Sequence, residues 1–242
     1  MTFECTIIVP VFNEEDNLLR LEQAFQSFIK RAKIPSTVLF VNDGSQDNSQ
    51  QIIEDICSNN AVFHYIQLSK NEGLSTALKA GFDHTTTSLV GYIDADLQTS
   101  PEDFNRLFEH IKDYEMVTGV RQNRQDNFIK KITSRTGNTG RRLFTKDGID
   151  DTGCPLKIIK TDYAKRLPMF KGLHRFLPAL IQLQNGRVKQ VPVRHFPRLA
   201  GTSHFGLRSR FATTILDCFA FVWIKHRTIT YTVSSQYLGD SK

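Results

Sequence analysis

Two aspartates one residue apart, Asp94 and Asp96, have the types and spacing best suited to chemistry in this chain. They follow the apolar run 89–93, which is typical of a buried strand, so both carboxylates are expected in the loop where the strand ends. Two ionised carboxylates this close repel each other and need a counter-charge. Mg²⁺ or Mn²⁺ would supply it, because carboxylates, water and phosphate oxygens are the ligands of these cations. Gln98 could add a neutral oxygen.

The alternative is that the two aspartates are structural turn residues that bind no ligand, since Asp is common in turns. The residues that follow favour a site. Ser100 and Pro101 are typical of an N-cap and a first helical position, and Glu102 and Asp103 place acids in the first turn. The carboxylates are therefore predicted to lie between a strand end and a helix start.

Charge is divided unevenly along the 242 residues, whose net charge is +6. Residues 1–120 carry 8 Lys and Arg against 18 Asp and Glu, whereas residues 121–210 carry 20 against 5. An acidic half able to hold a metal thus precedes a basic stretch suited to phosphates or an anionic surface. The four cysteines form no C-x-x-C pair, and the N-terminus shows no signal peptide, so we expect reduced thiols and a cytoplasmic location, without a zinc site or disulfides.

Strand and helix patterns alternate in the first half. Strands are predicted at 5–11, 37–41, 62–66 and 89–93, and helices follow the first three, with Asn13 as an N-cap of the first helix. This alternation predicts an α/β fold with a mostly parallel sheet, in which ligands bind beyond the carboxyl ends of the strands. Four polar segments fall at that edge: 12–14, 43–45, 69–71 and 94–96. The G-x-G-x-x-G fingerprint and the P-loop are absent, which disfavours a dehydrogenase or an ATPase.

Residues 8–14, 41–47 and 94–98 resemble, in order and spacing, the nucleotide-sugar domain of family 2 glycosyltransferases, which are inverting enzymes with a GT-A fold. The resemblance implies a GT-A (Rossmann-like), mostly parallel sheet flanked by helices. It also implies a metal site at Asp94, Asp96 and Gln98. The nucleotide-binding residues expected at this edge are Pro10, Phe12, Glu14, Asp43, Lys70 and Asp94.

In the second half, residues 151–157, 172–178 and 198–206 resemble the polyprenyl-phosphate branch, which includes dolichyl-phosphate mannose synthases and bacterial undecaprenyl-phosphate sugar synthases. Arg121 and Arg135 stand where arginines of that branch meet the lipid phosphate. The chain departs from the branch in having His204 in place of a lysine and Thr136-Gly137 in place of bulky residues. We expect none of the transmembrane helices that follow in many relatives.

The chemical class of the acceptor determines which catalytic groups the enzyme needs. A sugar hydroxyl needs a general base, for which Asp150 or Asp151 is the candidate. A phosphate monoester is already ionised near neutral pH and needs positioning, which suits guanidinium groups. We favour the phosphate, with Asp151 orienting substrate or supporting the arginines. The predicted acceptor-phosphate or diphosphate residues are Arg121, Arg135, Arg198 and His204, and the catalytic set is Asp94, Asp96, Arg121, Arg135 and Asp151.

The segment 211–224 is apolar and flanked by basic residues, but its 14 residues fall short of the about 20 that a membrane span needs, and Asp217 lies at its centre. As a helix it could lie in the membrane interface with Trp223 at headgroup level, or pack on the core of the protein. Residues 128–132 could form a second such surface. His174 and His195 are left unassigned, because a lone His beside apolar residues is more often part of a core or its rim than catalytic.

We therefore predict a metal-dependent inverting transferase that moves a sugar from a nucleotide sugar, UDP- rather than GDP-linked, to undecaprenyl or dolichyl phosphate. It would work as a peripheral protein at the cytoplasmic face of the inner membrane, without a nucleic-acid partner. Residues 1–206 are the expected GT-A domain, with a nucleotide-sugar half (1–120) and an acceptor half (121–206), and 207–242 a C-terminal amphipathic helix and tail. The alternatives are a family 2 enzyme acting on a glycan hydroxyl and a non-catalytic module that binds anionic surfaces. The oligomeric state stays open.

Overall fold

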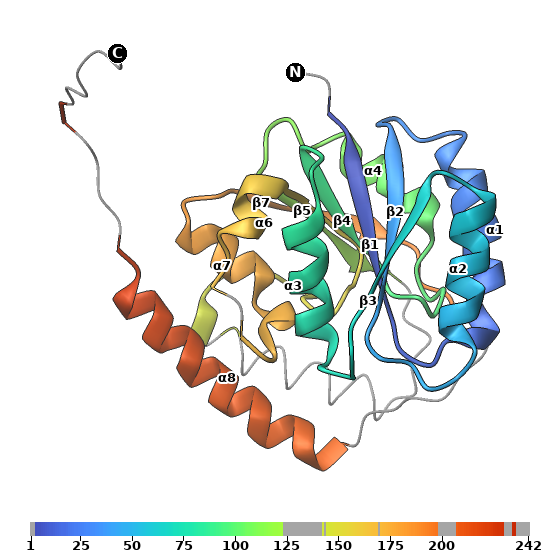
Figure 1. Cartoon of the computed structure of the whole chain (residues 1–242). Helices are drawn as coiled ribbons and strands as arrows, with labels where there is room; N and C mark the ends of the chain where they lie inside the picture. Colours follow the sequence, from blue (N-terminus) through green and yellow to red (C-terminus); the bar gives the residue numbers. More distant parts are fainter. Residues whose placement is uncertain are drawn as a thin grey trace, which may run out of the picture.

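A seven-stranded mixed sheet runs through the part of the chain that the computed structural model describes (Figure 1). The described residues are 3–122, 142, 144–168, 170–197, 207–229 and 234–235. The strands lie side by side in the order β3-β2-β1-β4-β6-β5-β7. Their bounds are β1 Cys5–Val11, β2 Ser36–Asn42, β3 Phe63–Gln67, β4 Leu89–Tyr92, β5 Met116–Arg121, β6 Lys157–Lys160 and β7 Val188–Val193.

One strand runs against the others. The pairs β3–β2, β2–β1, β1–β4 and β5–β7 are parallel, whereas β6 is antiparallel to both β4 and β5. Tyr92, the last residue of β4, therefore faces Lys157, the first residue of β6. The start of β6 consequently lies at the edge where the parallel strands end. The predicted mostly parallel sheet is confirmed.

Helices cover both faces of the sheet (Figure 1). Alternate residues of β1 point to opposite sides, so Ile7 and Val9 join one apolar core and Ile8 the other. The first core is covered by α1 Glu15–Ile29, α2 Ser49–Asn59 and α4 Phe104–Phe108. The second is covered by α3 Leu74–His84, α6 Thr161–Lys165, α7 Leu177–Leu183 and α8 Leu207–Arg227. Two short helical turns are η1 Pro101–Asp103 and η2 Leu173–Arg175.

Helix starts agree only in part with the sequence pattern. Ser100 caps η1, because its Oγ accepts a hydrogen bond from the backbone N–H of Glu102 at 3.3 Å. The prediction that Asn13 caps the first helix was wrong: Glu14 is the N-cap residue of α1. Asn13 instead adopts a left-handed φ of 54° and bonds to Ser45 and Gln46. Its side chain joins the loops after β1 and β2.

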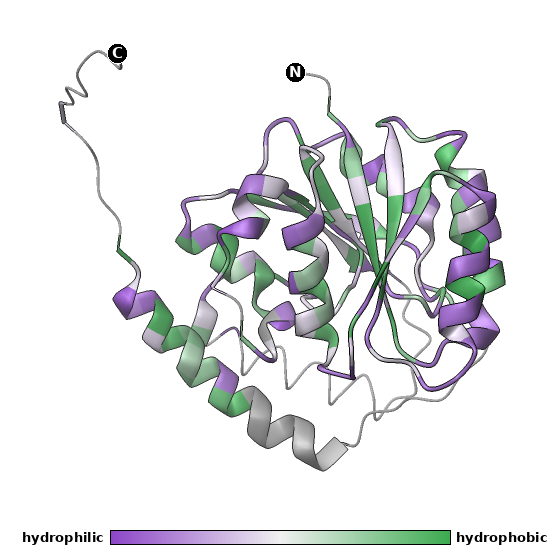
Figure 2. Cartoon of the chain, viewed as in Figure 1, coloured by the Kyte–Doolittle hydropathy of each residue, from purple (hydrophilic) through white to green (hydrophobic). Residues whose placement is uncertain are grey.

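The C-terminal helix α8 has two different faces over its described side chains. Cys218 and Phe221 are buried against the second core, and the Phe221 ring stacks on Phe176 with 5.6 Å between centroids. Packing on the core, one of the two expectations for this segment, is therefore confirmed. Another stripe of apolar side chains is exposed, and Figure 2 shows the apolar residues of α8 in green. We call it the α8 stripe: Ile215, Leu216, Phe219 and Trp223.

None of the helices in the described ranges combines the length and the apolar character that crossing a membrane requires. Asp217, at the centre of the apolar segment, lies 3.6 Å from the guanidinium of Arg175 in an ion pair. Its carboxylate lies so close to Gly172 that a Cβ at that glycine would be 2.3 Å from Oδ2. The aspartate therefore ties α8 to the segment 172–175. The other predicted surface segment, 128–132, lies outside the described residues.

Candidate active site

The two aspartates lie in a tight turn directly after β4. Asp96 is buried and Asp94 partly buried. The turn is closed by Asp96, whose Oδ1 accepts a hydrogen bond from the backbone N–H of Gln98 at 3.1 Å. Leu97 takes a left-handed φ of 55°, a conformation that non-glycine residues rarely adopt and that clusters at functional sites. The local backbone structure thus holds both carboxylates in one short, constrained turn.

The electrostatics of this turn suit a cation. Burial, and then the charge of Asp96, raise the pKa of Asp94 to about 6. The Tyr92 hydroxyl, which donates to Asp94 Oδ1 at 2.6 Å, and the charges of Lys157 and Arg121 act in the opposite direction. A divalent cation would relieve the remaining repulsion. Across the described residues no three His, Cys, Asp or Glu side chains gather around one point, so other ligands would have to come from water, phosphate or amide oxygens.

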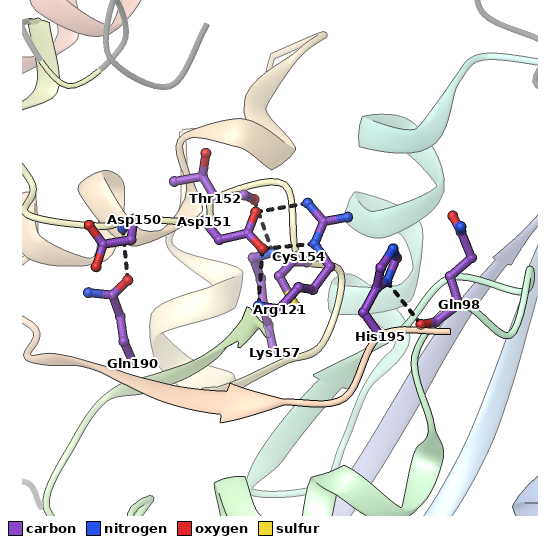
Figure 3. Close-up of polar contacts among 9 residues, drawn as sticks. All are labelled: Gln98, Arg121, Asp150, Asp151, Thr152, Cys154, Lys157, Gln190 and His195. Carbon is purple, nitrogen blue, oxygen red and sulfur yellow. Dashed lines mark hydrogen bonds and ion pairs between the residues drawn. The ribbon is translucent and has the colours of Figure 1, made fainter. Parts of the chain in front are cut away.

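The loop after β7 is bonded to the same turn. The Gln98 carbonyl oxygen accepts a hydrogen bond from the backbone N–H of Phe196 at 2.9 Å and lies 3.1 Å from Nδ1 of His195 (Figure 3). His195 is therefore part of the site, although sequence reasoning left it unassigned. Its position just after a strand-like run was the available signal. The Gln98 side chain as a metal ligand stays a prediction.

Asp43 joins the loops after β2 and β3. Its buried carboxylate accepts hydrogen bonds from the backbone N–H groups of Glu72 and Gly73, both at 2.8 Å. Burial raises the pKa of Asp43 above its usual value, and these two bonds reduce the rise only in part. Gly44 has a φ of +67°, and a Cβ there would lie 2.4 Å from the carbonyl carbon of Lys70. Asp43 and Gly44 therefore hold the 70–73 loop close against the β2 loop.

The other predicted nucleotide-binding residues are distributed along the same edge. Pro10 pairs with Val41 near the end of β1. Glu14 accepts a 2.6 Å hydrogen bond from the Asn17 side chain. The Lys70 side chain is exposed and forms an ion pair with Glu72 at 3.1 Å. Phe12 follows the end of β1 and is partly buried. The structure brings these residues to one edge, and their contacts with a nucleotide stay predictions.

Arg121 and Asp151 form a bidentate ion pair next to the aspartate turn. Nε and Nη2 of Arg121 donate to the two carboxylate oxygens of Asp151, each at 2.8 Å (Figure 3). The backbone N–H of Arg121 donates to the same carboxylate at 3.2 Å. Both side chains are largely buried, with 13% and 8% of their surfaces exposed. Arg121 also lies within electrostatic reach of Asp94.

The remaining predicted acceptor residues are placed only in part. The carboxylate of Asp150 pairs with Arg142 at 3.1 Å, and its backbone N–H donates to Gln190. Arg135, Arg198 and His204 lie outside the described residues. His174, which the sequence left unassigned, is partly buried, with Nδ1 3.1 Å from the Ser75 hydroxyl. The structure therefore brings Arg121 and Asp151 to the aspartate turn.

Solved structures with the same fold support the predicted architecture. A glucosyl-3-phosphoglycerate synthase from Mycobacterium tuberculosis, in complex with phosphoglyceric acid, aligns with a TM-score of 0.67 and 12% identity over 92% of this chain and 80% of that one. A mannosyltransferase from Pyrobaculum calidifontis, in complex with GDP-Man and Mn²⁺, aligns with a TM-score of 0.65 and 18% identity over 91% of this chain and 64% of that one. The GT-A-like fold is confirmed.

The sequence itself identifies the family. Residues 6–167, more than half of the chain, match the family model described as Glycosyl transferase family 2. The matched range begins in β1, includes the Asp43 loop and the aspartate turn, and extends past Asp151 and Lys157. The non-catalytic binding module is thereby disfavoured. This chain belongs to glycosyl transferase family 2 and is a glycosyltransferase.

Proposed function

We propose that this glycosyltransferase transfers a sugar from a nucleoside-diphosphate sugar to a polyprenyl phosphate. The observation that carries the proposal is the buried ion pair of Arg121 and Asp151 beside the aspartate turn. A guanidinium held in one orientation presents planar paired donors, the geometry that recognises phosphate oxygens. Asp151 fixes that orientation because it binds both Nε and Nη2.

The same ion pair disfavours a hydroxyl acceptor. Deprotonating a hydroxyl requires a general base within hydrogen-bond reach of it. Both candidates for that base are paired with arginines: Asp151 with Arg121, and Asp150 with Arg142. Both carboxylate oxygens of Asp151 already accept hydrogen bonds from Arg121. A phosphate acceptor needs no base, since its second pKa is about 6 and it is ionised at neutral pH.

The donor is proposed to bind at the carboxyl ends of β1, β2 and β4. Asp94 and Asp96, with Gln98, would hold Mg²⁺ or Mn²⁺, which when bound offsets the charge of the leaving diphosphate. The pocket for base and ribose would be formed by Pro10, Phe12, Glu14, Asp43 and Lys70. Structures of the mycobacterial synthase contain Mn²⁺ with UDP-glucose and Mg²⁺ with UDP, and that of the Pyrobaculum mannosyltransferase contains Mn²⁺ with GDP-Man, which supports a divalent metal and a nucleotide-sugar donor. Of the two nucleosides we propose uridine.

The transfer is a single displacement. An oxygen of the acceptor phosphate attacks C1 of the sugar while the bond from C1 to the diphosphate oxygen breaks. The bonding electron pair leaves with the nucleoside diphosphate, so the configuration at C1 inverts and no proton has to be moved. Arg121 would hold the attacking phosphate, with Arg135, Arg198 and His204 as further candidates.

The α8 stripe supports a location at a membrane surface. Its exposed side chains include Trp223, 65% exposed, and the helix ends with Lys225, His226 and Arg227. Aromatic residues and basic side chains together are typical of helices lying in the interface of an anionic bilayer. We propose attachment at the cytoplasmic face of the inner membrane, where a polyprenyl acceptor would be embedded.

The proposal is tested by incubating the purified protein with Mn²⁺, a panel of labelled UDP- and GDP-sugars and, in separate reactions, a polyprenyl phosphate in detergent, a glycan or phosphoglyceric acid. The expected result is labelled lipid-linked sugar that depends on the metal and is lost in D96N. D83N, which changes an exposed aspartate of α3, is the matched control and should retain activity. Transfer only to a glycan hydroxyl or to phosphoglyceric acid would refute the lipid acceptor. No transfer from any donor by folded protein would refute the proposed reaction.

A further inference from the structure

Lys157 is a buried lysine with no role in the reaction proposed above. It is the first residue of β6 and only 1% exposed, between the buried residues Leu156 and Ile158. An ammonium group in such a place is costly unless its donors are bonded and its charge is compensated. The contacts of its Nζ therefore indicate what it does.

The Nζ of Lys157 binds the loop that precedes β6. It donates to the carbonyl oxygen of Thr152 at 3.3 Å and to that of Cys154 (Figure 3). The ammonium also lies 5.6 Å from the centre of the Tyr92 ring, on the neighbouring strand. Without this ammonium, the carbonyl oxygen of Cys154 would lose a hydrogen-bond donor in a buried environment.

The loop held by Lys157 is the loop that contacts the guanidinium of Arg121. Asp151 binds the guanidinium from one end of the loop. Gly153 approaches it so closely that a Cβ there would lie 3.1 Å from Nη2. The path of residues 151–154 thus determines where the guanidinium lies, and Lys157 anchors that path at two carbonyl groups.

We propose that Lys157 is a positioning residue that fixes the 151–154 loop and, through it, the orientation of Arg121 toward the acceptor phosphate. The acceptor in this statement rests on the function proposed above, whereas the control of Arg121 does not. Lys157 acts by geometry and compensating charge and does not contact the substrate.

Chemical labelling of Arg121 tests the proposal without any acceptor. Phenylglyoxal modifies accessible guanidinium groups, and peptide mass spectrometry reads the labelling at Arg121. In K157M the loop loses its anchor, so labelling should be at least about threefold faster than in the wild type. K160M is the matched control: Lys160 is on the same strand and pairs with Glu115 at 3.1 Å, away from the site. Equal rates in wild type, K157M and K160M would overturn the proposal.

A double-mutant cycle then tests the coupling in the reaction. At saturating nucleotide sugar and Mn²⁺, where the lost charge near Asp94 does not limit donor binding, K157M should lower kcat/KM for the polyprenyl phosphate about tenfold. In an R121A background the same substitution should have almost no further effect. An equal loss in both backgrounds would overturn the proposal, because Lys157 would then act independently of Arg121.

The design also covers two possible failures: a folding defect in K157M and an error in the proposed acceptor. If K157M fails to fold by circular dichroism, K157Q replaces it: its side chain is one bond shorter and uncharged, so labelling of Arg121 should still be faster than in the wild type, and an equal rate would overturn the proposal. Wild-type enzyme that makes no lipid-linked product would refute the acceptor proposed above, and the labelling experiment would still decide the role of Lys157.

Discussion

The hydroxyl of Tyr92 donates a 2.6 Å hydrogen bond to Oδ1 of Asp94, the first carboxylate of the aspartate turn. Tyr92 is the last residue of β4 and is buried, so the strand itself positions the donor. A hydrogen bond to a carboxylate favours its ionised form and fixes its rotamer. Tyr92 at the strand end therefore orients the Asp94 carboxylate and favours its ionised form, which is the form that binds a cation.

The substitution Y92F should weaken metal-dependent nucleotide binding without unfolding the protein. Loss of a hydrogen bond to a charged group costs about 1.5–3 kcal/mol, so we expect UDP with Mn²⁺ to bind about ten- to a hundredfold more weakly, measured by calorimetry. Y65F is the control, because the Tyr65 hydroxyl lies 3.5 Å from Glu54 at the surface. Equal affinities in wild type and Y92F would show that the bond has no part in metal binding.

Asp94 should make stability depend on pH. Its pKa is raised in the folded protein, from 3.8 to about 6, so the folded state holds a proton that the unfolded chain has lost between these values. This contribution to stability is present at low pH and lost as the pH rises through about 6. In metal-free buffer D94N should therefore melt a few degrees above the wild type at pH 7.5, with a smaller difference at pH 4.5. A difference that is independent of pH would contradict the raised pKa.

Removing the Asp43 carboxylate should loosen the 70–73 loop and the donor pocket together. D43A leaves the backbone N–H groups of Glu72 and Gly73 without their acceptor, at a cost of about 1–3 kcal/mol in the free energy of unfolding. Denaturant unfolding measures this loss, and a nucleotide titration should show weaker binding. D83N, at an exposed ion pair, should stay within about 0.5 kcal/mol of the wild type. Unchanged nucleotide affinity in D43A would show that the 70–73 loop does not contribute to donor binding.

The substitution D151N distinguishes a positioning carboxylate from a general base. If Asp151 only orients Arg121, the KM for the acceptor phosphate should rise about tenfold while kcat falls little, because the amide can still accept one hydrogen bond. Removal of a general base would instead lower kcat by about 10²–10⁴. Steady-state kinetics with varied acceptor measure both parameters, and a kcat loss in the second range would support a hydroxyl acceptor.

The α8 stripe should bind lipid. Replacing Leu216, Phe219 and Trp223 together with serine should abolish sedimentation with vesicles of anionic phospholipid, while leaving the buried Cys218 and Phe221 packed. L19S, at another exposed apolar side chain, is the control and should still sediment. Binding that persists in the triple variant, at low and high salt, would show that this stripe is not the membrane contact.

The first half of the fold could be predicted because its signals are local. Runs of β-branched residues between turn residues predicted strands at 5–11 and 37–41, and the structure has Cys5–Val11 and Ser36–Asn42. Parallel strands then bring their ends to one edge whatever their order in the sheet. The convergence of Asp43 and the aspartate turn follows from that rule alone.

The second half depends on contacts that no local pattern encodes. The reversed direction of β6 and its place between β4 and β5 result from packing between distant segments. Lys157 was overlooked, although a single lysine inside the apolar run Leu156-Lys157-Ile158 is itself a signal of a paired, buried charge. His195 was overlooked because its partner, the Gln98 carbonyl, lies 97 positions away in the sequence.

If donor and acceptor bind as proposed, the reversal of β6 separates the two substrates along the chain. Loops that follow parallel strands of the first half surround the donor side, whereas the loop at 151–154 precedes a strand and still opens at the same edge. The sequence of the 151–154 loop could therefore differ between relatives without changing the loops proposed to bind the nucleotide. Grafting that loop between relatives is a direct route to changing what receives the sugar while the donor is kept.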